Sequence, residues 1–251
     1  MKFPNDFINK IFLETQGKFE YLKQIPNNSI DLIIIDPPYL TTKEDWDKEE
    51  VVSDRLSKEL FEVAKDSCSL YVWCGIGEKS QSLIRWFPVF SKNWYFKDLI
   101  TWKKQRGIGM RKGWLYTREE IMWFVKDNKN FIWNEENQYS DMELRKIEQL
   151  FTGKVAKSKF KRLTNVWTDI SEQNIIGQKN PIKTHFTPKP IKALERIIKC
   201  HTKENDIVLD CFMGSGSVAL ACKNLNRNFI GMEIYQNYID ISYKRLSEVK
   251  L

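Results

Sequence analysis

The sequence predicts an α/β fold, in which a mostly parallel sheet carries helices on both faces. Residues 32–35 are a short, continuous run of Leu and Ile, which is typical of a strand buried on both sides. Apolar runs of this kind alternate along the chain with amphipathic helical patterns, which is the order of an α/β protein. Near the C-terminus, a strand pattern over residues 206–210 leads into a glycine-rich turn and a helical pattern.

Size and composition indicate a folded protein with an affinity for polyanions. The 251 residues suffice for one α/β domain with an insertion, or for a domain and a half. Hydrophobic residues make up 42% of the chain and the formal net charge is +7, which is compatible with a nucleic-acid partner. The first residues do not resemble a secretory signal, and no run approaches the roughly 18 apolar residues of a membrane span. We therefore expect a cytoplasmic protein.

Cysteine and histidine usage argues against a metal centre. The chain has five cysteines and two histidines, and no two cysteines form a Cys-x-x-Cys pair. We expect neither a zinc site nor a disulfide scaffold.

Periodicity and turn signals predict the other elements of the first half. Residues 17–30 are expected to form a short amphipathic helix that ends in a Pro-Asn-Asn-Ser turn before the first strand. Further on we expect helices over residues 53–67 and 79–86, and strands over residues 69–74, 96–102 and 120–126.

Residues 36–39, Asp-Pro-Pro-Tyr, follow the buried strand directly. Two consecutive prolines end the strand, because neither donates to a sheet and each fixes its own φ. The carboxyl edge of an open α/β sheet is where ligands bind. Asp36 and a neighbouring carbonyl are suited to accept both hydrogens of an exocyclic amine, while Tyr39 stacks on the heterocycle. The alternative is an acidic turn with a packed tyrosine.

The segment over residues 103–114 has the composition of a nucleic-acid-binding loop. It contains five basic residues, glycines and a tryptophan, and no acid. Lysine and arginine pair with phosphates, and tryptophan stacks on bases. A solvated basic loop is the alternative. The candidate DNA contacts here are Lys103, Lys104, Arg106, Arg111, Lys112 and Trp114.

Residues 128–183 match no α/β unit and are interpreted as an inserted subdomain that grips DNA. A helix is expected over residues 141–151, and residues 153–162 carry five basic side chains and no acid. A dimerisation arm is the main alternative. The candidate DNA contacts in the insertion are Lys157, Lys159, Lys161 and Arg162.

The last part of the chain has the pattern of a nucleotide-binding half. We expect helices over residues 191–199, 218–225 and 235–248, and strands over residues 206–210 and 229–232. The glycines of the turn let the backbone approach a ligand closely, and Glu233, at the tip of the second strand, is suited to bind ribose hydroxyls. A nicotinamide dehydrogenase also carries such a fingerprint, but too few residues follow Gly216 to complete its two-part domain.

Three motifs together resemble the amino-methyltransferases of DNA: residues 36–39, residues 185–190 (His-Phe-Thr-Pro-Lys-Pro) and residues 210–216 (Asp-Cys-Phe-Met-Gly-Ser-Gly). Their order looks like that of the permuted β group. The resemblance implies a Rossmann-like S-adenosylmethionine-dependent methyltransferase fold with an inserted target-recognition subdomain. It divides the chain into a catalytic half over residues 1–127, a target-recognition region over residues 128–183 and a cofactor-binding half over residues 184–251.

The resemblance also implies a reaction and its residues. The expected activity is methyl transfer from S-adenosylmethionine to adenine N6 in double-stranded DNA after base flipping. Expected partners are double-stranded DNA, a cognate restriction endonuclease and a second copy of the chain. The catalytic residues would be Asp36, Pro37, Pro38 and Tyr39. The cofactor would contact Thr187, Lys189, Asp210, Phe212, Gly214, Ser215, Gly216 and Glu233.

The sequence departs from the family pattern at three positions. Gly17 stands where an aspartate near the cofactor is common, Phe186 where a proline is usual, and Pro188 where a glutamine is usual. Three alternatives to adenine methylation in DNA remain open at this point. They are transfer to cytosine N4, which is more often associated with serine in place of Asp36, methylation of adenine in RNA, and a catalytically inactive DNA-binding protein.

Overall fold

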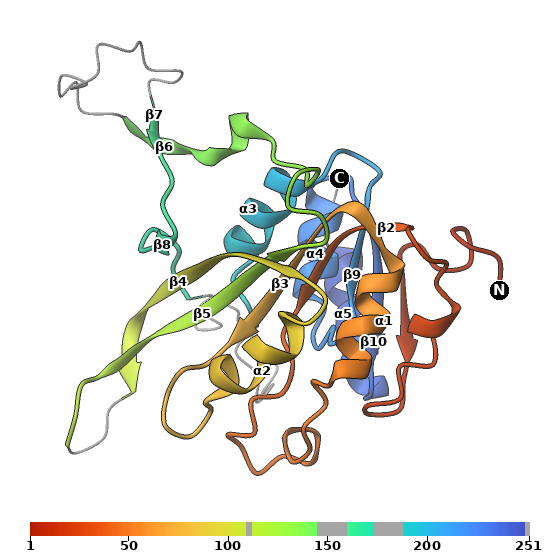
Figure 1. Ribbon diagram of the computed structural model, residues 1–251, viewed down its shortest axis with the longest axis horizontal. Helices are drawn as coiled ribbons and strands as arrows, with labels where there is room; N and C mark the ends of the chain where they lie inside the picture. Colours follow the sequence, from red (N-terminus) through yellow and green to blue (C-terminus); the bar gives the residue numbers. More distant parts are fainter. Residues whose placement is uncertain (109–111, 145–159, 173–187, 249–251) are drawn as a thin grey trace.

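The computed structural model describes residues 1–108, 112–144, 160–172 and 188–248 as one twisted sheet with helices on both faces and a small projecting sheet (Figure 1). The large sheet has eight strands in the order β1-β10-β9-β2-β3-β5-β4-β8, and the small one pairs β6 with β7. The strands are β1 (Lys10–Leu13), β2 (Ile30–Ile35), β3 (Ala64–Cys74), β4 (Tyr95–Ile108), β5 (Tyr116–Val125), β6 (Tyr139–Leu144), β7 (Phe160–Arg162), β8 (Val166–Trp167), β9 (Ile207–Asp210) and β10 (Asn228–Glu233).

Most neighbouring strands of the large sheet are parallel. β1, β10, β9, β2 and β3 run the same way, β5 is antiparallel to both β3 and β4, and β8 is parallel to β4. The expected mostly parallel α/β sheet is therefore confirmed.

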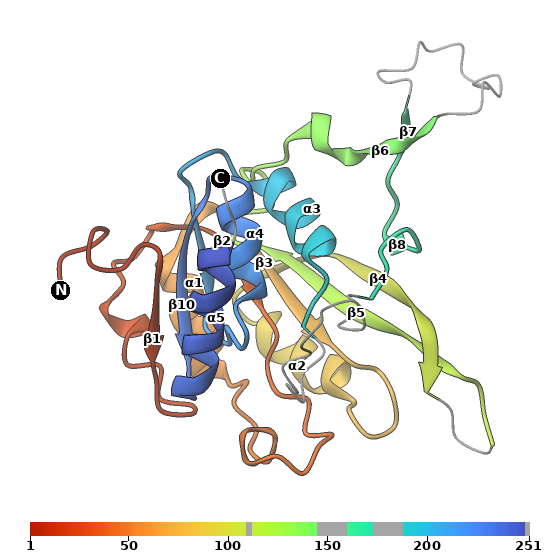
Figure 2. The same ribbon diagram turned by 180° about the vertical axis from the view of Figure 1, so that it is seen from behind.

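Helices cover the sheet from two sides. α1 (Asp54–Val63) and α2 (Ser82–Phe90) lie on the face seen in Figure 1, and α3 (Ile191–His201), α4 (Ser217–Asn224) and α5 (Gln236–Glu248) lie on the face seen in Figure 2. Each side has its own core. Leu56 and Trp86 belong to the first core, and Leu194 and Val218 belong to the second.

Strand β2 shows why its sequence is a continuous apolar run. All six of its residues are buried. Ile33 and Ile35 point into the first core, and Leu32 and Ile34 point into the second, because successive side chains of a strand leave on opposite faces. A strand buried on both faces is thus confirmed for residues 32–35.

The strand order reverses between β2 and β9. From β2 the chain passes through α1 to β3 on one side, and from β9 it passes through α4 to β10 on the other. Such a switch point leaves a crevice at the carboxyl ends of the two strands. Asp36 follows β2 directly, and Asp210 is the last residue of β9.

Most of the helices and strands expected from the sequence are present, but two are wrong, and the helix expected over residues 53–67 ends at Val63 because β3 begins at Ala64. Residues 17–29 contain only a short 3₁₀ turn, η1 (Leu22–Gln24), before β2 begins at Ile30. Gly17 and Phe19 adopt φ of 70° and 51°, which an α-helix cannot accommodate. Residues 141–144 belong to strand β6 instead of a helix, since β6 pairs with β7. Residues 145–151 of that expected helix lie outside the described residues.

The basic segment after residue 102 is also more regular than expected. β4 continues to Ile108 and β5 begins at Tyr116, so the two strands form a hairpin that projects from the body of the molecule (Figure 1). Two other 3₁₀ turns, η2 (Asp45–Asp47) and η3 (Glu135–Gln138), complete the elements. None of the described helices is both long and apolar enough to cross a membrane.

Candidate active site

A pocket lies at the crevice between β2 and β9. Its empty volume, part of which is open to solvent, is about 470 Å³. Its lining brings the end of β2 together with the glycine loop (residues 211–216) and with the segment before α3. The lining residues are Ile34, Ile35, Asp36, Trp73, Pro188, Lys189, Leu194, Asp210, Phe212, Met213, Gly214, Ser215, Ser217 and Val218.

Two neighbours hold the carboxylate of Asp36. The Tyr39 hydroxyl donates to Oδ1 at 2.9 Å, and the Lys189 ammonium lies 3.1 Å from Oδ2. The surrounding protein raises the pKa of Asp36, because burial disfavours the charged form, and Lys189 opposes this effect. The side chain nevertheless keeps 35% of its surface exposed, so a group that enters the pocket can reach it.

The chain after Tyr39 is fixed by a buried acid. The Asp47 carboxylate, which is 2% exposed, accepts hydrogen bonds from the backbone N–H groups of Leu40, Thr41 and Thr42 at 2.5 to 2.7 Å. The Tyr39 ring packs edge-on against Trp86, with 5.8 Å between ring centroids. The Asp-Pro-Pro-Tyr loop is therefore held by its neighbours as well as by its own prolines.

Lys189 is enclosed on several sides. Its ammonium pairs with Glu119 Oε2 at 2.9 Å in addition to Asp36, and it lies 5.0 Å from the centroid of the Trp73 ring. Lys104 pairs with the other oxygen of Glu119. Of the residues described, those lining the pocket include one buried side-chain donor without a partner, the indole nitrogen of Trp73.

The glycine loop is tied to the tip of β10. Glu233 Oε2 accepts a hydrogen bond from the N–H of Gly214 at 2.8 Å, and Oε1 accepts from Ile234 and Tyr235. Burial raises the pKa of Glu233, and these backbone donors oppose that effect. Gly216 has a φ of 79°, and a Cβ there would meet Ser242 at 2.7 Å, so glycine is required on both counts.

Asp210 and Phe212 lie at the entrance to the glycine loop. Asp210 Oδ1 accepts from the backbone N–H of Phe212 at 2.9 Å, and burial raises the pKa of Asp210 well above its usual value. The Phe212 ring packs edge-on against Phe19. Ser215 Oγ accepts a hydrogen bond from Arg245 at 3.0 Å, which joins the loop to α5.

The structure brings most of the expected site residues together. Asp36, Lys189, Asp210, Phe212, Gly214 and Ser215 line one pocket, Tyr39 borders it, and Glu233 and Gly216 support its glycine loop. Thr187 lies outside the described residues. Gly17 sits in an exposed turn with open space around its Cβ position.

Glu119 was missed from the sequence. It stands next to Glu120 in a strand that is otherwise apolar at its centre, and an acid pair in such a place was the available signal. Its partner Lys104 was expected to contact DNA. The structure instead directs Lys104 to Glu119, with 20% of its side chain exposed.

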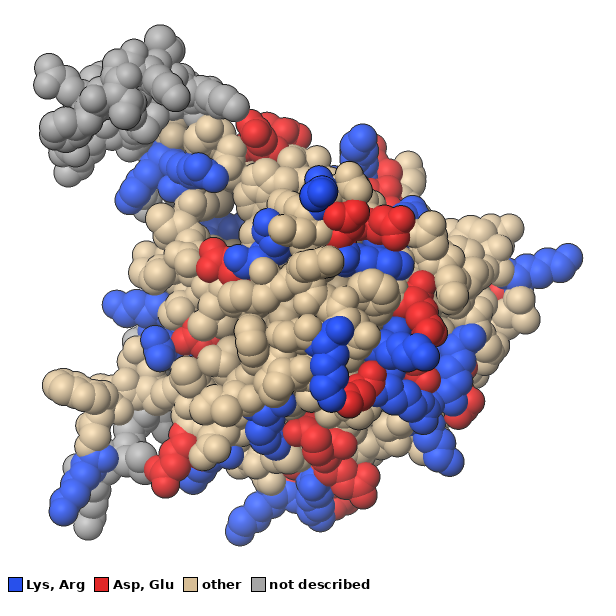
Figure 3. Space-filling view, in the orientation of Figure 1, with Lys and Arg blue, Asp and Glu red and all other residues tan. Residues whose placement is uncertain are grey.

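The other expected DNA contacts divide into two groups. Lys103, Lys112 and Trp114 are exposed on the β4–β5 hairpin, and Lys161 and Arg162 are exposed on β7. Figure 3 shows basic side chains at the end of the hairpin and beside the small sheet, while acids and bases are mixed over the rest of this face. The side chain of Arg106, and residues Arg111, Lys157 and Lys159, lie outside the described part of the chain.

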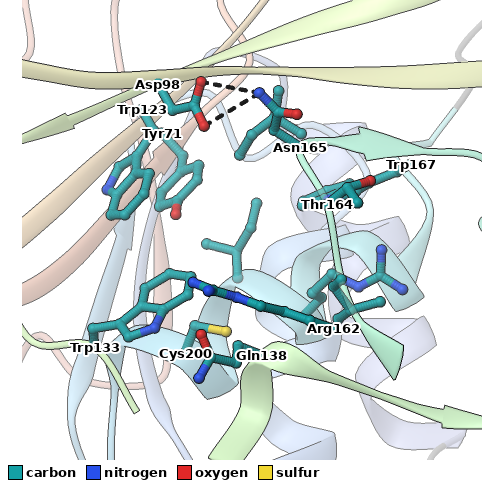
Figure 4. A pocket seen from close by; sticks show the side chains of 14 residues that line it. Tyr71, Asp98, Trp123, Trp133, Gln138, Arg162, Thr164, Asn165, Trp167 and Cys200 are labelled. Atoms are coloured by element: carbon teal, nitrogen blue, oxygen red, sulfur yellow. Dashed lines mark hydrogen bonds between the residues drawn. The ribbon is translucent and has the colours of Figure 1, made fainter. Parts of the chain in front are cut away.

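A second pocket lies on the α3 side of the sheet and shares no residue with the first. Its empty volume, part of which is open to solvent, is about 710 Å³, and Figure 4 shows Trp133, Arg162 and Asn165 around it. Asp98 accepts hydrogen bonds from the Asn165 amide at 3.2 and 3.3 Å. Apart from Arg162, this pocket contains none of the residues expected to act in catalysis or binding.

Comparison with known proteins agrees with this geometry. The profile of the family described as DNA methylase (N6_N4_Mtase) matches residues 30–244. The chain is 32% identical to type II methyltransferase M1.MboII of Moraxella bovis, over 97% of this chain and 98% of that protein. It is 30% identical to DNA adenine methyltransferase YhdJ of Escherichia coli (strain K12), over 90% of this chain and 79% of that protein.

A solved structure supports the same assignment. The crystal structure of the M1.HpyAVI–SAM complex is similar with a TM-score of 0.62 and 25% identity, and the match covers 94% of this chain and 98% of that one. The family profile spans both the Asp-Pro-Pro-Tyr loop and the glycine loop, which the fold places side by side. This chain therefore belongs to the N6_N4 family of DNA methylases.

Proposed function

We propose that this protein transfers the methyl group of S-adenosylmethionine to N6 of adenine in double-stranded DNA. One observation carries the proposal: the Asp36 carboxylate opens into the same pocket as the glycine loop. A base amine held by Asp36 would then face a methyl donor held by the glycine loop. The relative YhdJ, which is named an adenine methyltransferase, supports adenine as the target.

The chain's own groups suit the activation of an amine. The lone pair of an aromatic amine is delocalised into the ring, so the amine is a poor nucleophile. Hydrogen bonds from its two hydrogens to Asp36 and to the Pro37 carbonyl would favour the pyramidal geometry of the transition state. Among the described residues, no backbone N–H donates to the Pro37 carbonyl, which leaves it available.

The residues around the glycine loop fit the methyl donor. When bound, S-adenosylmethionine supplies an electrophilic methyl group on its sulfonium. Within the described part of the chain, Glu233 Oε2 accepts one hydrogen bond, from Gly214, so it retains a lone pair for a ribose hydroxyl. A Cβ on Gly214 would meet nothing closer than a carbonyl oxygen at 4.0 Å, which leaves room for a ligand against the backbone. We assign cofactor binding to Asp210, Phe212, Gly214, Ser215, Gly216 and Glu233. Of the two other residues expected to contact the cofactor, Thr187 lies outside the described residues, and the Lys189 ammonium is paired with Asp36 and Glu119.

The target base would leave the duplex to reach Asp36. Flipping costs a few kcal/mol of lost stacking, and the Tyr39 ring at the pocket would replace part of it. The exposed basic residues of the hairpin and of β7 would bind the phosphates on either side. We also propose that the chain consists of a catalytic half over residues 1–127, a target-recognition region over residues 128–183 and a cofactor-binding half over residues 184–251.

Three further proposals concern the partners and the location of the protein. Because M1.MboII is named a type II methyltransferase, we propose that the partner of this protein is a restriction endonuclease that acts on the same DNA site. We propose that the protein works in the cytoplasm, with access to chromosomal DNA. A homodimer is also proposed, and analytical ultracentrifugation at several protein concentrations would detect it.

The reaction is tested by identification of the product. Unmethylated duplex DNA is incubated with S-adenosylmethionine and the protein, digested to nucleosides and analysed by mass spectrometry, with Asp36→Ala in parallel. We expect N6-methyladenine that disappears with the variant. N4-methylcytosine would move the protein to the other branch of its family, and modification of RNA alone would overturn the proposed substrate.

A further inference from the structure

Four charged side chains form a continuous row beside the pocket. Lys189 lies 3.1 Å from Asp36 and 2.9 Å from Glu119, and Glu119 in turn pairs with Lys104. The four residues come from four separate segments: the loop after β2, the segment before α3, strand β5 and strand β4. Acids and bases alternate along the row, so each interior charge has a partner of opposite sign on both sides.

The Lys189 ammonium is largely buried among its neighbours. The Tyr39 hydroxyl lies 3.3 Å away, and the centroids of the Tyr39 and Trp73 rings lie 5.2 and 5.0 Å away. The Lys189 side chain is 13% exposed and that of Glu119 is 11% exposed. A buried charge is tolerated only when it is paired, and aromatic faces add to the attraction for a cation.

Glu119 is the rigid member of this arrangement. A lysine has a long, flexible side chain, whereas Glu119 stands on β5, where it is paired with Trp102 of β4, one residue beyond the last pair between β5 and β3. Lys104 holds its second oxygen. The ammonium of Lys189 is thus fixed from a strand that contributes nothing else to the pocket.

We propose that Glu119 is a positioning residue for methyl transfer: it seats Lys189 against Asp36, and Lys189 keeps the Asp36 carboxylate ionised and aimed at the base amine. The inference rests on the proposed function, because it assigns Asp36 its catalytic role. Glu119 touches neither base nor cofactor in this scheme, and it acts only through Lys189.

Lys189 and Glu119 shift the pKa of Asp36 in opposite directions. Lys189 lowers the pKa of Asp36, and Glu119 raises it. Burial raises the pKa values of Tyr39 and Cys74, so the phenol and the thiol remain neutral around neutral pH. Asp210, across the pocket, adds a further carboxyl, whose own pKa is raised by burial and by Asp36. Removal of the Lys189 charge is therefore expected to raise the pKa of Asp36 and to shift the pH profile to higher pH.

The test measures single-turnover methyl transfer against pH for wild type, Lys189→Met and Glu119→Gln. Activity requires ionised Asp36, so Lys189→Met should move the acid limb of the profile to higher pH. Glu119→Gln should slow transfer at the plateau by about tenfold to a hundredfold, the scale expected for a misplaced reacting group. Binding of S-adenosylmethionine and the KM for DNA should stay within about threefold of wild type, since Glu119 contacts neither ligand in the proposal.

Glu120→Gln is the matched control. Glu120 lies on the same strand, is buried, and pairs instead with Thr101 and Arg118. Its substitution removes an equal charge without touching Lys189, and should leave the rate within about threefold. Lys104→Met is the second variant, because it frees Glu119 without removing it, and it should slow transfer less than Glu119→Gln.

Two results would overturn the inference. One is a wild-type plateau rate in Glu119→Gln. The other is an equal loss of methyl transfer in Glu119→Gln and Glu120→Gln, with the Tm lowered in both. That result would show that Glu119 has a merely structural role. If Glu119→Gln does not fold, a wild-type rate in Lys104→Met would count against the proposal. Failure of the proposed function is distinct, because wild type itself would then form no N6-methyladenine.

Discussion

Asp36 and Asp210 stand at the carboxyl ends of two neighbouring parallel strands, although they come from opposite halves of the chain. Strands β2 and β9 pair through Leu32 with Val208 and Ile33 with Leu209. Asp36 belongs to the loop that we assign to the target base, and Asp210 opens the loop that we assign to the cofactor. The reversal of strand order at this point therefore joins the two halves of the proposed reaction in one pocket.

The Tyr39 hydroxyl and the Tyr39 ring are expected to contribute separately. Tyr39→Phe removes the 2.9 Å hydrogen bond to Asp36 and should slow single-turnover transfer by about threefold to tenfold, the worth of one such bond. Tyr39→Ala also removes the stacking surface and should weaken binding of the flipped base by about 1–3 kcal/mol. The fluorescence of 2-aminopurine at the target position reports flipping. Equal flipping in Tyr39→Ala and wild type would contradict the stacking role.

Gly216 is expected to be far less tolerant than Gly17. Both have left-handed φ values, 79° and 70°, but a Cβ at Gly216 would meet Ser242 at 2.7 Å, whereas a Cβ at Gly17 would meet nothing within 4 Å. Gly17→Ala should lower the free energy of unfolding by about 1–2 kcal/mol from backbone strain alone. Gly216→Ala should add an overpacking cost of about 1–3 kcal/mol. Urea unfolding measures both, and equal losses would contradict the close contact with Ser242.

His201 is expected to make the protein acid-sensitive. Its ring is buried, its Nδ1 donates to the Ile132 carbonyl at 2.7 Å, and its Nε2 lies 2.7 Å from the Tyr71 hydroxyl. Burial lowers the pKa of His201 from 6.5 to about 4. Between these values the unfolded chain binds the proton and the folded protein does not.

The contribution of neutral His201 to the free energy of unfolding is therefore fully present above pH 6.5. It falls by up to about 3 kcal/mol as the pH drops towards 4. Chemical unfolding of wild type and His201→Gln at several pH values would measure it. The variant should lose less stability than wild type over this window, and parallel curves would show that His201 is not responsible.

Trp114 is expected to bind DNA without supporting the fold. Its side chain is 97% exposed on the projecting hairpin. Trp114→Ala should leave thermal unfolding unchanged and weaken DNA binding by about 1–3 kcal/mol if its ring stacks on a base. Lys112→Ala, two residues before it, should instead lower the slope of log affinity against log salt concentration by about one, the value for one phosphate contact. Unchanged affinity in Trp114→Ala would remove the hairpin from the interface.

The sequence allowed prediction of the features that depend on local signals. The β2 run, the prolines after it and the glycine loop each carry their conformation in neighbouring residues, and the structure has them at one crevice. The helix over residues 17–30 failed because positive φ at Phe19 is set by its tertiary surroundings and not by periodicity. Strand β6 was not predicted because its partner, β7, is distant in the sequence.

The pairing of Glu119 with Lys189 was also beyond prediction from the sequence. It depends on β5 lying antiparallel beside β3, so that Glu119 reaches the edge where Asp36 stands. The sequence of the hairpin contains several basic residues, but it does not indicate which of them pair with acids of the protein and which face solvent. Lys104 and Lys103 are adjacent in sequence, yet Lys104 meets Glu119 and Lys103 faces solvent.

The charge of Asp36 is the feature on which the proposed reaction depends. Asp36→Asn keeps the size of the side chain but replaces one accepting oxygen with a donor, so it can no longer accept the amine hydrogen in the same way. Single-turnover methyl transfer and the Kd of S-adenosylmethionine should be measured on the same preparation of wild type and Asp36→Asn. We predict a rate lower by at least about a hundredfold, with a Kd within about threefold of wild type. A wild-type rate in Asp36→Asn would contradict the role of Asp36 and the mechanism built on it.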